Sequence, residues 1–464
     1  MLIPLNLDRE RPLQQQLFDQ LRDLIVSGRL AAGSRMPSSR MLADEFAVSR
    51  ITVLLTYERM IADGLLETLP ARGTFVRGQP RPVPVLAGSQ GRRTCRTLDE
   101  LDVDQPDPAE FPTRRWRALV RESLDRLGAT LAMERTDGHP DLRRAIAGWL
   151  SASRGLNVSP DQVVLAACRQ QALYLAVHLL LLPGQTAVVE DPCHRAIDYI
   201  LTSAAARLVR VPVDDDGIRL TELPREGAAL VHVTPEHQQP LGMLMSVPRR
   251  EALLNWTKRT GSMILEEDCD GELRYGRMDL PPLMASDRDQ RVVHVGSFAA
   301  SLGPGVSSGY LVVPANRIDA ALSVRRLIDG HAGWLEESAL AELLGSGAYA
   351  RHLHQLRKTY LSRRDALIRS LQHHFGGAGG FTGIQAGLHL IWHYPPVLGS
   401  AAKVAALARQ AGLRATPSPV SASGAGASGI QVGFGMPGVR QIEAAVAHLA
   451  ACLCPAEQDT LAAN

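Results

Sequence analysis

The stretch from Pro37 to Val76 constrains the fold of this 464-residue chain more than any other. Two short amphipathic segments, PSSRMLADEF and RITVLLTYERMIADG, are separated by a brief turn at Ala47-Val48. The first of these two helices is expected to open at Ser38 or Ser39, and Ser49 stands where the N-cap of the second belongs. The alternating segment LLETLPARGTFV follows at once and predicts a small hairpin with its turn near residues 71–73. Two helices this close, followed by a hairpin, predict a helix-turn-helix with a β-wing.

An earlier helix completes the module. PLQQQLFDQLRDLIVSG carries its apolar residues at helical spacing, and Gly28 ends the pattern. The apolar stripe of this first helix comprises Leu13, Leu17, Leu21, Leu24 and Ile25. On the third helix, which closes at Gly64, we expect Val53, Tyr57, Met60 and Ile61 to be buried. Residues 1–78 are therefore predicted to form an α+β winged helix-turn-helix domain.

Such a domain predicts which residues contact DNA. The second helix of the pair enters the major groove with its first residues at the base edges, so Arg50 is the expected guanine reader. Other arginines near the helix starts and the wing tip are expected at phosphates or in the minor groove. The predicted DNA-binding set is Arg35, Ser39, Arg40, Ser49, Arg50, Ile51, Thr52, Arg72, Gly73 and Thr74. Acidic residues and arginines are nearly balanced in this region, so its net charge does not favour DNA as the partner. A small helical protein–protein interaction module is therefore the alternative.

The region from Pro12 to Val76 closely resembles the DNA-binding domain of GntR-type bacterial repressors. The pattern PxSRxLAxxxxVSRxTVxxxYExxxxxGxLxxxxxxGTFV is nearly complete in this chain. Leu55 departs from it, since relatives often carry arginine at that position. The resemblance implies double-stranded operator DNA as a partner.

Residues 79–104 mix proline, glycine and basic residues without apolar periodicity and predict an exposed linker. The six cysteines show no CxxC pair or zinc-ligand spacing, so we expect no metal site and a reducing compartment. The first ten residues have no signal-peptide pattern, and the longest apolar run falls far short of the roughly 20 residues of a membrane span. These features favour a cytoplasmic protein with no membrane partner, associated with the nucleoid when bound to DNA.

Strands and helices alternate from residue 105 to 455, which predicts an α/β domain with a mostly parallel sheet. TAVVEDP, AALVHVTP, SMILEEDC and VVHVGSF are the clearest strands, and a helix is expected between Arg249 and Thr260. A smaller α+β subdomain is expected over about residues 320–455, and residues 456–464 form a tail. In such sheets the loops after the strands carry the site.

Those loops resemble the fold-type I aminotransferase domain of MocR/GabR-type regulators. The matching order is CRQQAL, EDPCH, TPEHQQPLG, LEEDCD, GSFAASLGPG and AGLH, within a stretch from about Asp107 to Leu453. The resemblance implies a pyridoxal 5'-phosphate (PLP) pocket and a head-to-tail homodimer. It also implies that Ala300 stands where the family keeps its Schiff-base lysine, and the only lysines of the chain are Lys258, Lys358 and Lys403.

Other pocket positions also differ from the family pattern. Glu267 stands for the ring-nitrogen aspartate, Cys269 for a tyrosine at the ring hydroxyl, and Ser307 for a phosphate-binding arginine. Cys168 and Arg169 alter the phosphate loop, Met133 replaces a tyrosine that reaches the partner subunit, and His194 replaces a stacking aromatic. The vestigial pocket is thus predicted to comprise Met133, Cys168, Arg169, His194, His237, Glu267, Cys269, Ser297, Ala300 and Ser307.

These substitutions favour a regulator whose aminotransferase-like domain is degenerate, with no catalytic residue and no covalent cofactor, and serves dimerisation or effector sensing. PLP held without a covalent bond, residual transaminase activity, or another small-molecule effector are the alternatives. Arg169 and Arg195 could bind a small anionic effector or pair with Glu190, Asp191 or Glu267. His237 is expected to shape its loop.

Overall fold

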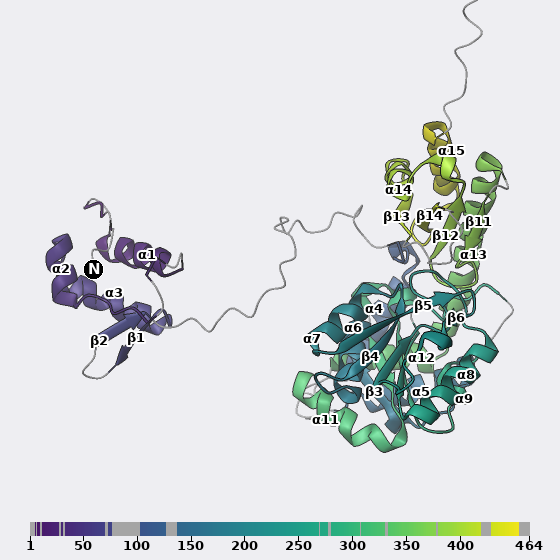
Figure 1. The fold of residues 1–464 in the computed structure, drawn as a ribbon, viewed down its shortest axis with the longest axis horizontal. Helices are drawn as coiled ribbons and strands as arrows, with labels where there is room; N and C mark the ends of the chain where they lie inside the picture. The colour runs from purple at the N-terminus through teal and green to yellow at the C-terminus, as the bar shows by residue number, and fades with distance from the viewer. Residues whose placement is uncertain are drawn as a thin grey trace, which may run out of the picture. The chain divides into compact units, whose positions relative to one another are not determined.

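A computed structural model describes this chain, with several ranges left out of the description. The residues outside the described structure are 1–4, 6, 10–11, 27–28, 31–32, 70–72, 77–102, 127–136, 269, 277–279, 307, 330–332, 377–378, 419–427 and 454–464. Contacts divide the chain into two compact units, Met1–Cys95 and Arg96–Asn464 (Figure 1). The dividing point falls inside the segment predicted to be a linker, most of which lies outside the described residues.

The N-terminal unit is the predicted winged helix-turn-helix. Its elements are α1 (Leu13–Val26), α2 (Ser39–Phe46), α3 (Arg50–Ala62), β1 (Leu66–Leu69) and β2 (Gly73–Val76), with the two strands antiparallel. The Ser38 hydroxyl accepts from the Met41 N–H and the Ser49 hydroxyl from the Ile51 N–H, both at 3.2 Å, so both expected caps are present. The helix starts were readable because a serine hydroxyl satisfies an otherwise unpaired helix donor.

The prediction that Ile61 of α3 lies in the core is wrong. Val53, Tyr57 and Met60 are buried, but Ile61 is 38% exposed. The buried face is completed by Thr56, whose hydroxyl donates to the Thr52 carbonyl. Successive residues turn by about 100° around a helix, so Ile61 points away from the face that Met60 occupies.

The second unit is built on an eight-stranded sheet ordered β3-β10-β9-β8-β7-β4-β5-β6. Its central pairs β9–β8, β8–β7, β7–β4 and β4–β5 are parallel, whereas β10 is antiparallel to both of its neighbours and β6 is antiparallel to β5. The strands are β3 (Val163–Ala166), β4 (Thr186–Asp191), β5 (Arg207–Asp214), β6 (Gly217–Ile218), β7 (Leu230–Val233), β8 (Met263–Asp268), β9 (Val292–Ser297) and β10 (Gly309–Val312). The expected mostly parallel α/β sheet is confirmed.

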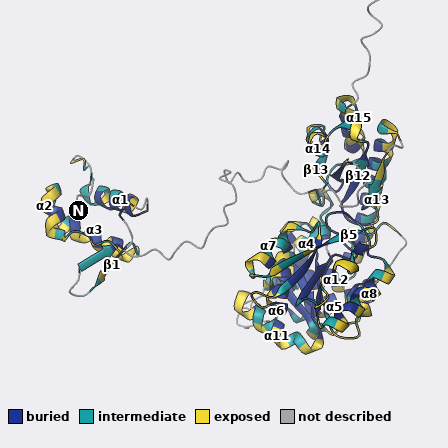
Figure 2. Cartoon of the chain, viewed as in Figure 1, coloured by how far each residue is buried: buried dark blue, intermediate teal, exposed yellow. Residues whose placement is uncertain are grey.

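Helices cover both faces of this sheet, and alternate residues of one strand reach different faces. Val189 of β4 belongs to a core with α6 (Arg169–Leu180), α7 (Arg195–Ser203) and α11 (Ile318–Asp329). Its neighbour Val188 belongs to a core with α8 (Val247–Thr260) and α9 (Leu283–Ser286). This alternation follows from the two-residue period of a strand, and Figure 2 shows the strands buried between more exposed helices.

A smaller four-stranded antiparallel sheet, ordered β11-β12-β14-β13, follows the large sheet in the chain. Its strands are β11 (Gly380–Thr382), β12 (His389–Tyr394), β13 (Arg414–Pro417) and β14 (Ser428–Gly433). The remaining helices are α4 (Thr113–Asp125), α5 (Pro140–Arg154), α10 (Ala299–Leu302), α12 (Trp334–Gly345), α13 (Ala348–Phe375), α14 (Ala401–Gln410) and α15 (Val439–Leu453). The predicted small α+β subdomain is therefore present.

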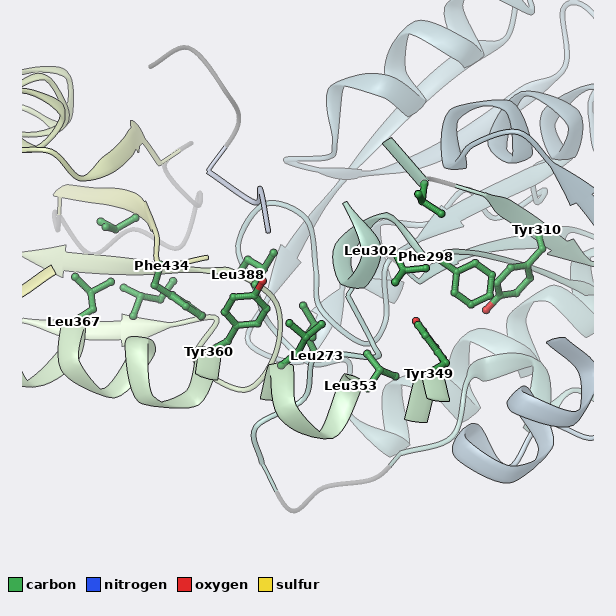
Figure 3. Packing of buried hydrophobic residues seen from close by; sticks show 14 of the residues in the cluster. Leu273, Phe298, Leu302, Tyr310, Tyr349, Leu353, Tyr360, Leu367, Leu388 and Phe434 are labelled. Atoms are coloured by element: carbon green, nitrogen blue, oxygen red, sulfur yellow. The ribbon is translucent and has the colours of Figure 1, made fainter. Parts of the chain in front are cut away.

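One continuous hydrophobic cluster joins the large and small sheets. It runs from Phe298 and Tyr310 at the large sheet, along α13, to Phe434 beside the small sheet (Figure 3). The rings of Phe298 and Tyr349 meet edge-on at 5.5 Å between centroids. Because these side chains share one core, the small subdomain packs on the large one rather than standing apart. No helix among the described residues is long and apolar enough to cross a membrane.

Candidate functional site

The first candidate surface is the start of α3 in the N-terminal unit. Arg50 is its first helical residue and is exposed, and its Nε lies 3.4 Å from the Ser39 hydroxyl at the start of α2. Ile51 is 67% exposed, whereas Thr52 is half-buried and Ser49 serves as the N-cap. Five of the predicted DNA-binding residues therefore gather where α2 and α3 begin, together with exposed Arg40.

The wing is joined to the segment that leads into α2. The Met36 N–H donates to the Thr74 carbonyl at 2.8 Å, and the Arg35 guanidinium lies against Gly73, where an added Cβ would come within 3.2 Å of Nε. Arg35 and Gly73 are thus adjacent, and φ of +106° at Gly73 suits glycine. Arg72, expected at the wing tip, lies outside the described residues.

The second candidate site lies at the carboxyl ends of the parallel strands in the large unit. Glu267, near the end of β8, has a fully buried side chain. Its Oε2 accepts from His232 Nε2 at 2.9 Å, and its Oε1 lies 3.5 Å from Arg169 Nε at the first residue of α6. A second nitrogen of Arg169 lies 3.5 Å from His194 Nε2. Of the carboxylates proposed as partners of Arg169, the structure selects Glu267.

The charges of this cluster determine its ionisation. Burial of Glu267 opposes ionisation, but the His232 hydrogen bond and the charge of Arg169 outweigh it and lower the pKa of Glu267. Burial, reinforced by Arg169, lowers the pKa of His194 despite the nearby Glu267. The cluster at neutral pH is therefore a buried carboxylate neutralised by an arginine that is 21% exposed.

The remaining predicted pocket residues are partly placed. Cys168 is the N-cap of α6 without a side-chain cap, His194 caps α7 through Nδ1, and Ser297 is buried at the end of β9. Ala300 lies half-buried in α10, directly after β9. Arg195 is exposed in α7. Met133, Cys269 and Ser307 lie outside the described residues.

A second cluster surrounds His237, which is buried. His237 Nδ1 donates to Asp270 at 3.1 Å, and the His237 and His389 rings lie 5.2 Å apart. His389 in turn forms an ion pair with Asp104 and donates to the Pro240 carbonyl. Asp104, at the end of the predicted linker, is thereby held on the large unit.

Asp104 and His389 each favour the other's charged form. Burial opposes the charge of both groups, yet their ion pair lowers the pKa of Asp104 and raises the pKa of His389. Sequence reasoning missed the roles of Asp104, His232, Asp270 and His389. The one local signal of a buried polar contact was His232, a polar residue within the apolar strand AALVHVTP.

Another carboxyl, that of half-buried Glu272, contacts α10 through Ser301. The Glu272 carboxyl accepts from the Ser301 hydroxyl at 3.0 Å and also contacts the Tyr349 hydroxyl. Burial raises the pKa of Glu272 to about 7, although both hydroxyls act to lower it. Unlike Glu267, this group has hydroxyls rather than a cation as its hydrogen-bond partners.

Among the residues the structure describes, no group of three or more His, Cys, Asp or Glu side chains could hold a metal ion. The chain's three lysines are all exposed: Lys258 on α8, Lys358 on α13 and Lys403 on α14. Lys258 forms an ion pair with Asp289 at 3.2 Å. None of the three belongs to the clusters around Glu267, His237 or Glu272.

Comparison with known proteins agrees with both units. Residues 13–76 match the family described as bacterial regulatory proteins, gntR family, and residues 101–426 match aminotransferase class I and II. The probable rhizopine catabolism regulatory protein MocR of Rhizobium meliloti is 31% identical over 417 residues, which cover 86% of this chain and 85% of that protein. This chain belongs to the MocR family of transcriptional regulators.

Further comparisons support this membership. The pyridoxine biosynthesis transcriptional regulator PdxR of Corynebacterium glutamicum is 32% identical over 374 residues, covering 80% of this chain and 81% of that protein. The crystal structure of an archaeal alanine:glyoxylate aminotransferase matches with a TM-score of 0.69 and 25% identity, covering 76% of this chain and 90% of that one. As a MocR-type regulator, the chain is a DNA-binding protein with an aminotransferase-like domain. Enzymes of the aminotransferase family with this fold depend on PLP.

The described residues of this MocR-type regulator fit PLP poorly. Ala300 has no amine, and the carboxylate expected to meet the ring nitrogen is already paired with Arg169 and His232. A guanidinium lies between Glu267 and His194, the two side chains expected to hold the ring. A bound ring would therefore compete with a cation that the chain itself supplies.

Proposed function

We propose that this chain is an operator-binding regulator whose aminotransferase-like domain has lost Schiff-base chemistry. The winged helix-turn-helix would comprise residues 1–78, a linker residues 79–104, and the effector and dimerisation domain residues 105–455. Within that domain the smaller subdomain would begin at about residue 320, and residues 456–464, predicted to be a tail, lie outside the described residues. The observation that carries the proposal is Ala300 directly after β9, where the family resemblance expects the lysine.

The chemistry of position 300 and of the chain's lysines supports this proposal. An alanine methyl group has no nucleophile, so it cannot form a covalent bond with an aldehyde. The exposed lysines on α8, α13 and α14 belong to none of the pocket clusters. We therefore propose no catalytic residue and no covalently bound cofactor. PLP bound without a covalent bond would have to displace Arg169 from Glu267, which makes such binding unfavourable.

The altered pocket would instead serve effector sensing. Arg169 is 21% exposed and Arg195 is exposed, so both offer cationic groups to a small anionic ligand. The pocket residues of the proposal remain Met133, Cys168, Arg169, His194, His237, Glu267, Cys269, Ser297, Ala300 and Ser307. The family resemblance supports a head-to-tail homodimer in which ligand binding shifts the population of conformations that reach DNA half-sites.

Two measurements test this proposal. Full-length protein is mixed with stoichiometric PLP and treated with borohydride, and its mass is measured by intact mass spectrometry. The control is a variant in which Lys258, Lys358 and Lys403 are all changed to arginine. We expect no adduct above the background of that control. A stoichiometric adduct in the wild type that the control lacks would overturn the loss of Schiff-base chemistry.

The second measurement concerns regulation. Duplexes that bind the full-length protein are selected from a random library, and affinity for the best one is measured with and without PLP. We expect sequence-specific binding that does not depend on the coenzyme. Binding that appears only with PLP would contradict the proposal.

A further inference from the structure

The exposed face of α3 is unusually apolar for a surface helix. Ile51 is 67% exposed, Leu54 40% and Leu55 45%. These residues are spaced by three and four along the helix and therefore share one face. The opposite face, with Val53, Thr56, Tyr57 and Met60, is buried in the core of the N-terminal unit. Three large aliphatic side chains on one water-facing helix surface point to a binding partner.

The charges beside this face favour DNA as that partner. Exposed Arg40 and Arg50 lie at the starts of α2 and α3, next to Ile51. Glu58 is exposed one turn beyond Leu55 and would repel a phosphate, so only the first two turns of α3 can approach the duplex closely. Arg59 is directed elsewhere, with its guanidinium 4.2 Å from the centre of the Phe18 ring and donating to Gln15 at 2.9 Å.

Aliphatic side chains in the major groove recognise one chemical group. Among the base edges displayed there, the C5 methyl group of thymine is the apolar feature. Arg50, the expected reader of guanine, donates to Ser39 in the free protein, so part of its donor capacity is already used. Beyond Arg50, the exposed face in the first two turns of α3 is aliphatic, with Ile51, Leu54 and Leu55.

We propose that Ile51 and Leu55 read thymine methyl groups, so that apolar contacts add to the base readout expected of Arg50. This inference rests on the operator binding proposed above. Residues four apart are about 6 Å apart along a helix, which is close to two base-pair steps of about 3.4 Å. The two side chains therefore reach thymines about two base pairs apart. Leu54, on the same face, borders this contact.

Deoxyuridine tests the proposal because it removes the methyl group and leaves every hydrogen-bonding atom of thymine unchanged. In the best selected duplex, each thymine is replaced in turn by deoxyuridine, and affinity is measured for the full-length wild type, Leu55→Ala and Ile51→Ala. We expect about a fourfold loss at one or two positions, the effect of removing one methyl contact. At those positions the corresponding alanine variant should no longer distinguish thymine from deoxyuridine.

Ile61→Ala is the matched control, since Ile61 is 38% exposed on the same helix but lies beyond Glu58. It should keep the full preference for thymine. Equal affinity of the wild type for thymine and deoxyuridine at every position would overturn the methyl readout while leaving operator binding intact. A Leu55→Ala variant that self-associates less but still prefers thymine would also overturn it, by assigning this face to a protein partner. Failure to select any duplex would instead contradict operator binding itself.

Discussion

The two candidate sites, at the start of α3 and around Glu267 at the carboxyl ends of the parallel strands, differ in how far their residues are exposed to water. At α3 Arg50 and Ile51 are exposed, and Arg50 hydrogen-bonds the Ser39 hydroxyl at 3.4 Å. At the carboxyl ends of the strands Glu267 is buried, accepts a hydrogen bond from His232 and has its charge balanced by Arg169. We therefore expect substitutions of the exposed DNA-contacting residues to change the free energy of unfolding little. Substitutions of the buried charged residues around Glu267 should lower it.

The sharpest way to break this comparison is to remove the buried carboxylate. Glu267→Ala leaves Arg169 and His232 without their shared partner, and we expect a loss of about 3 kcal/mol in the free energy of unfolding. Calorimetry of the large-unit transition measures this. Glu251→Ala is the control because Glu251 is exposed on α8, and its transition should be unchanged. Equal transitions for the two variants would refute a structural role for Glu267.

Glu272 sharpens the comparison because it is a half-buried carboxyl whose hydrogen bonds come from the Ser301 and Tyr349 hydroxyls and not from a cation. Its pKa of about 7 lies above the ordinary 4.5, so the folded protein binds a proton more tightly than the unfolded chain. Stability therefore falls as pH rises from about 4.5 to about 7 and stays reduced above that range.

Glu272→Gln removes this pH-dependent cost. We expect the variant to be about 2 kcal/mol more stable than the wild type at pH 8, relative to their difference at pH 4. Denaturant unfolding at both pH values measures the effect. A difference that does not change with pH would show that Glu272 ionises normally in the folded protein.

Arg50→Ala tests the exposed side of the comparison. We expect a loss of about tenfold in affinity for the selected operator, with little change for unrelated duplexes, because one base contact is removed. The thermal transition of the N-terminal unit should not move. Arg169→Ala is the control and should keep operator preference. An unchanged preference in Arg50→Ala would contradict its base-reading role.

The smallest expected effect belongs to Arg40. Arg40→Ala should weaken binding to all duplexes about equally and reduce the slope of log affinity against log salt by about 1, since one phosphate contact is lost. Titrations at several salt concentrations measure the slope. A sequence-dependent loss with an unchanged slope would assign Arg40 to base readout instead.

The winged helix-turn-helix was largely readable from the sequence because its signals are local. Ser38 and Ser49 cap helices within three residues, and the alternation in LLETLPARGTFV specifies adjacent strands. Ile61 was mispredicted because a position near a helix end can be assigned to either face by periodicity alone.

The clusters of the large unit could not be read in this way. Periodicity identified the strands but not the antiparallel direction of β10, nor which of three carboxylates would meet Arg169. Asp104 and His389 lie far apart in the sequence, and no local pattern links them.

Residue identity alone determined that position 300 carries no amine and that the chain has three lysines, because covalent chemistry requires particular atoms. Tertiary structure alone decided that the pKa of Glu267 is lowered beside Arg169 and His232 while desolvation raises the pKa of Glu272 to about 7. The same side chain behaves differently because its charge depends on the partners and water that the fold leaves around it.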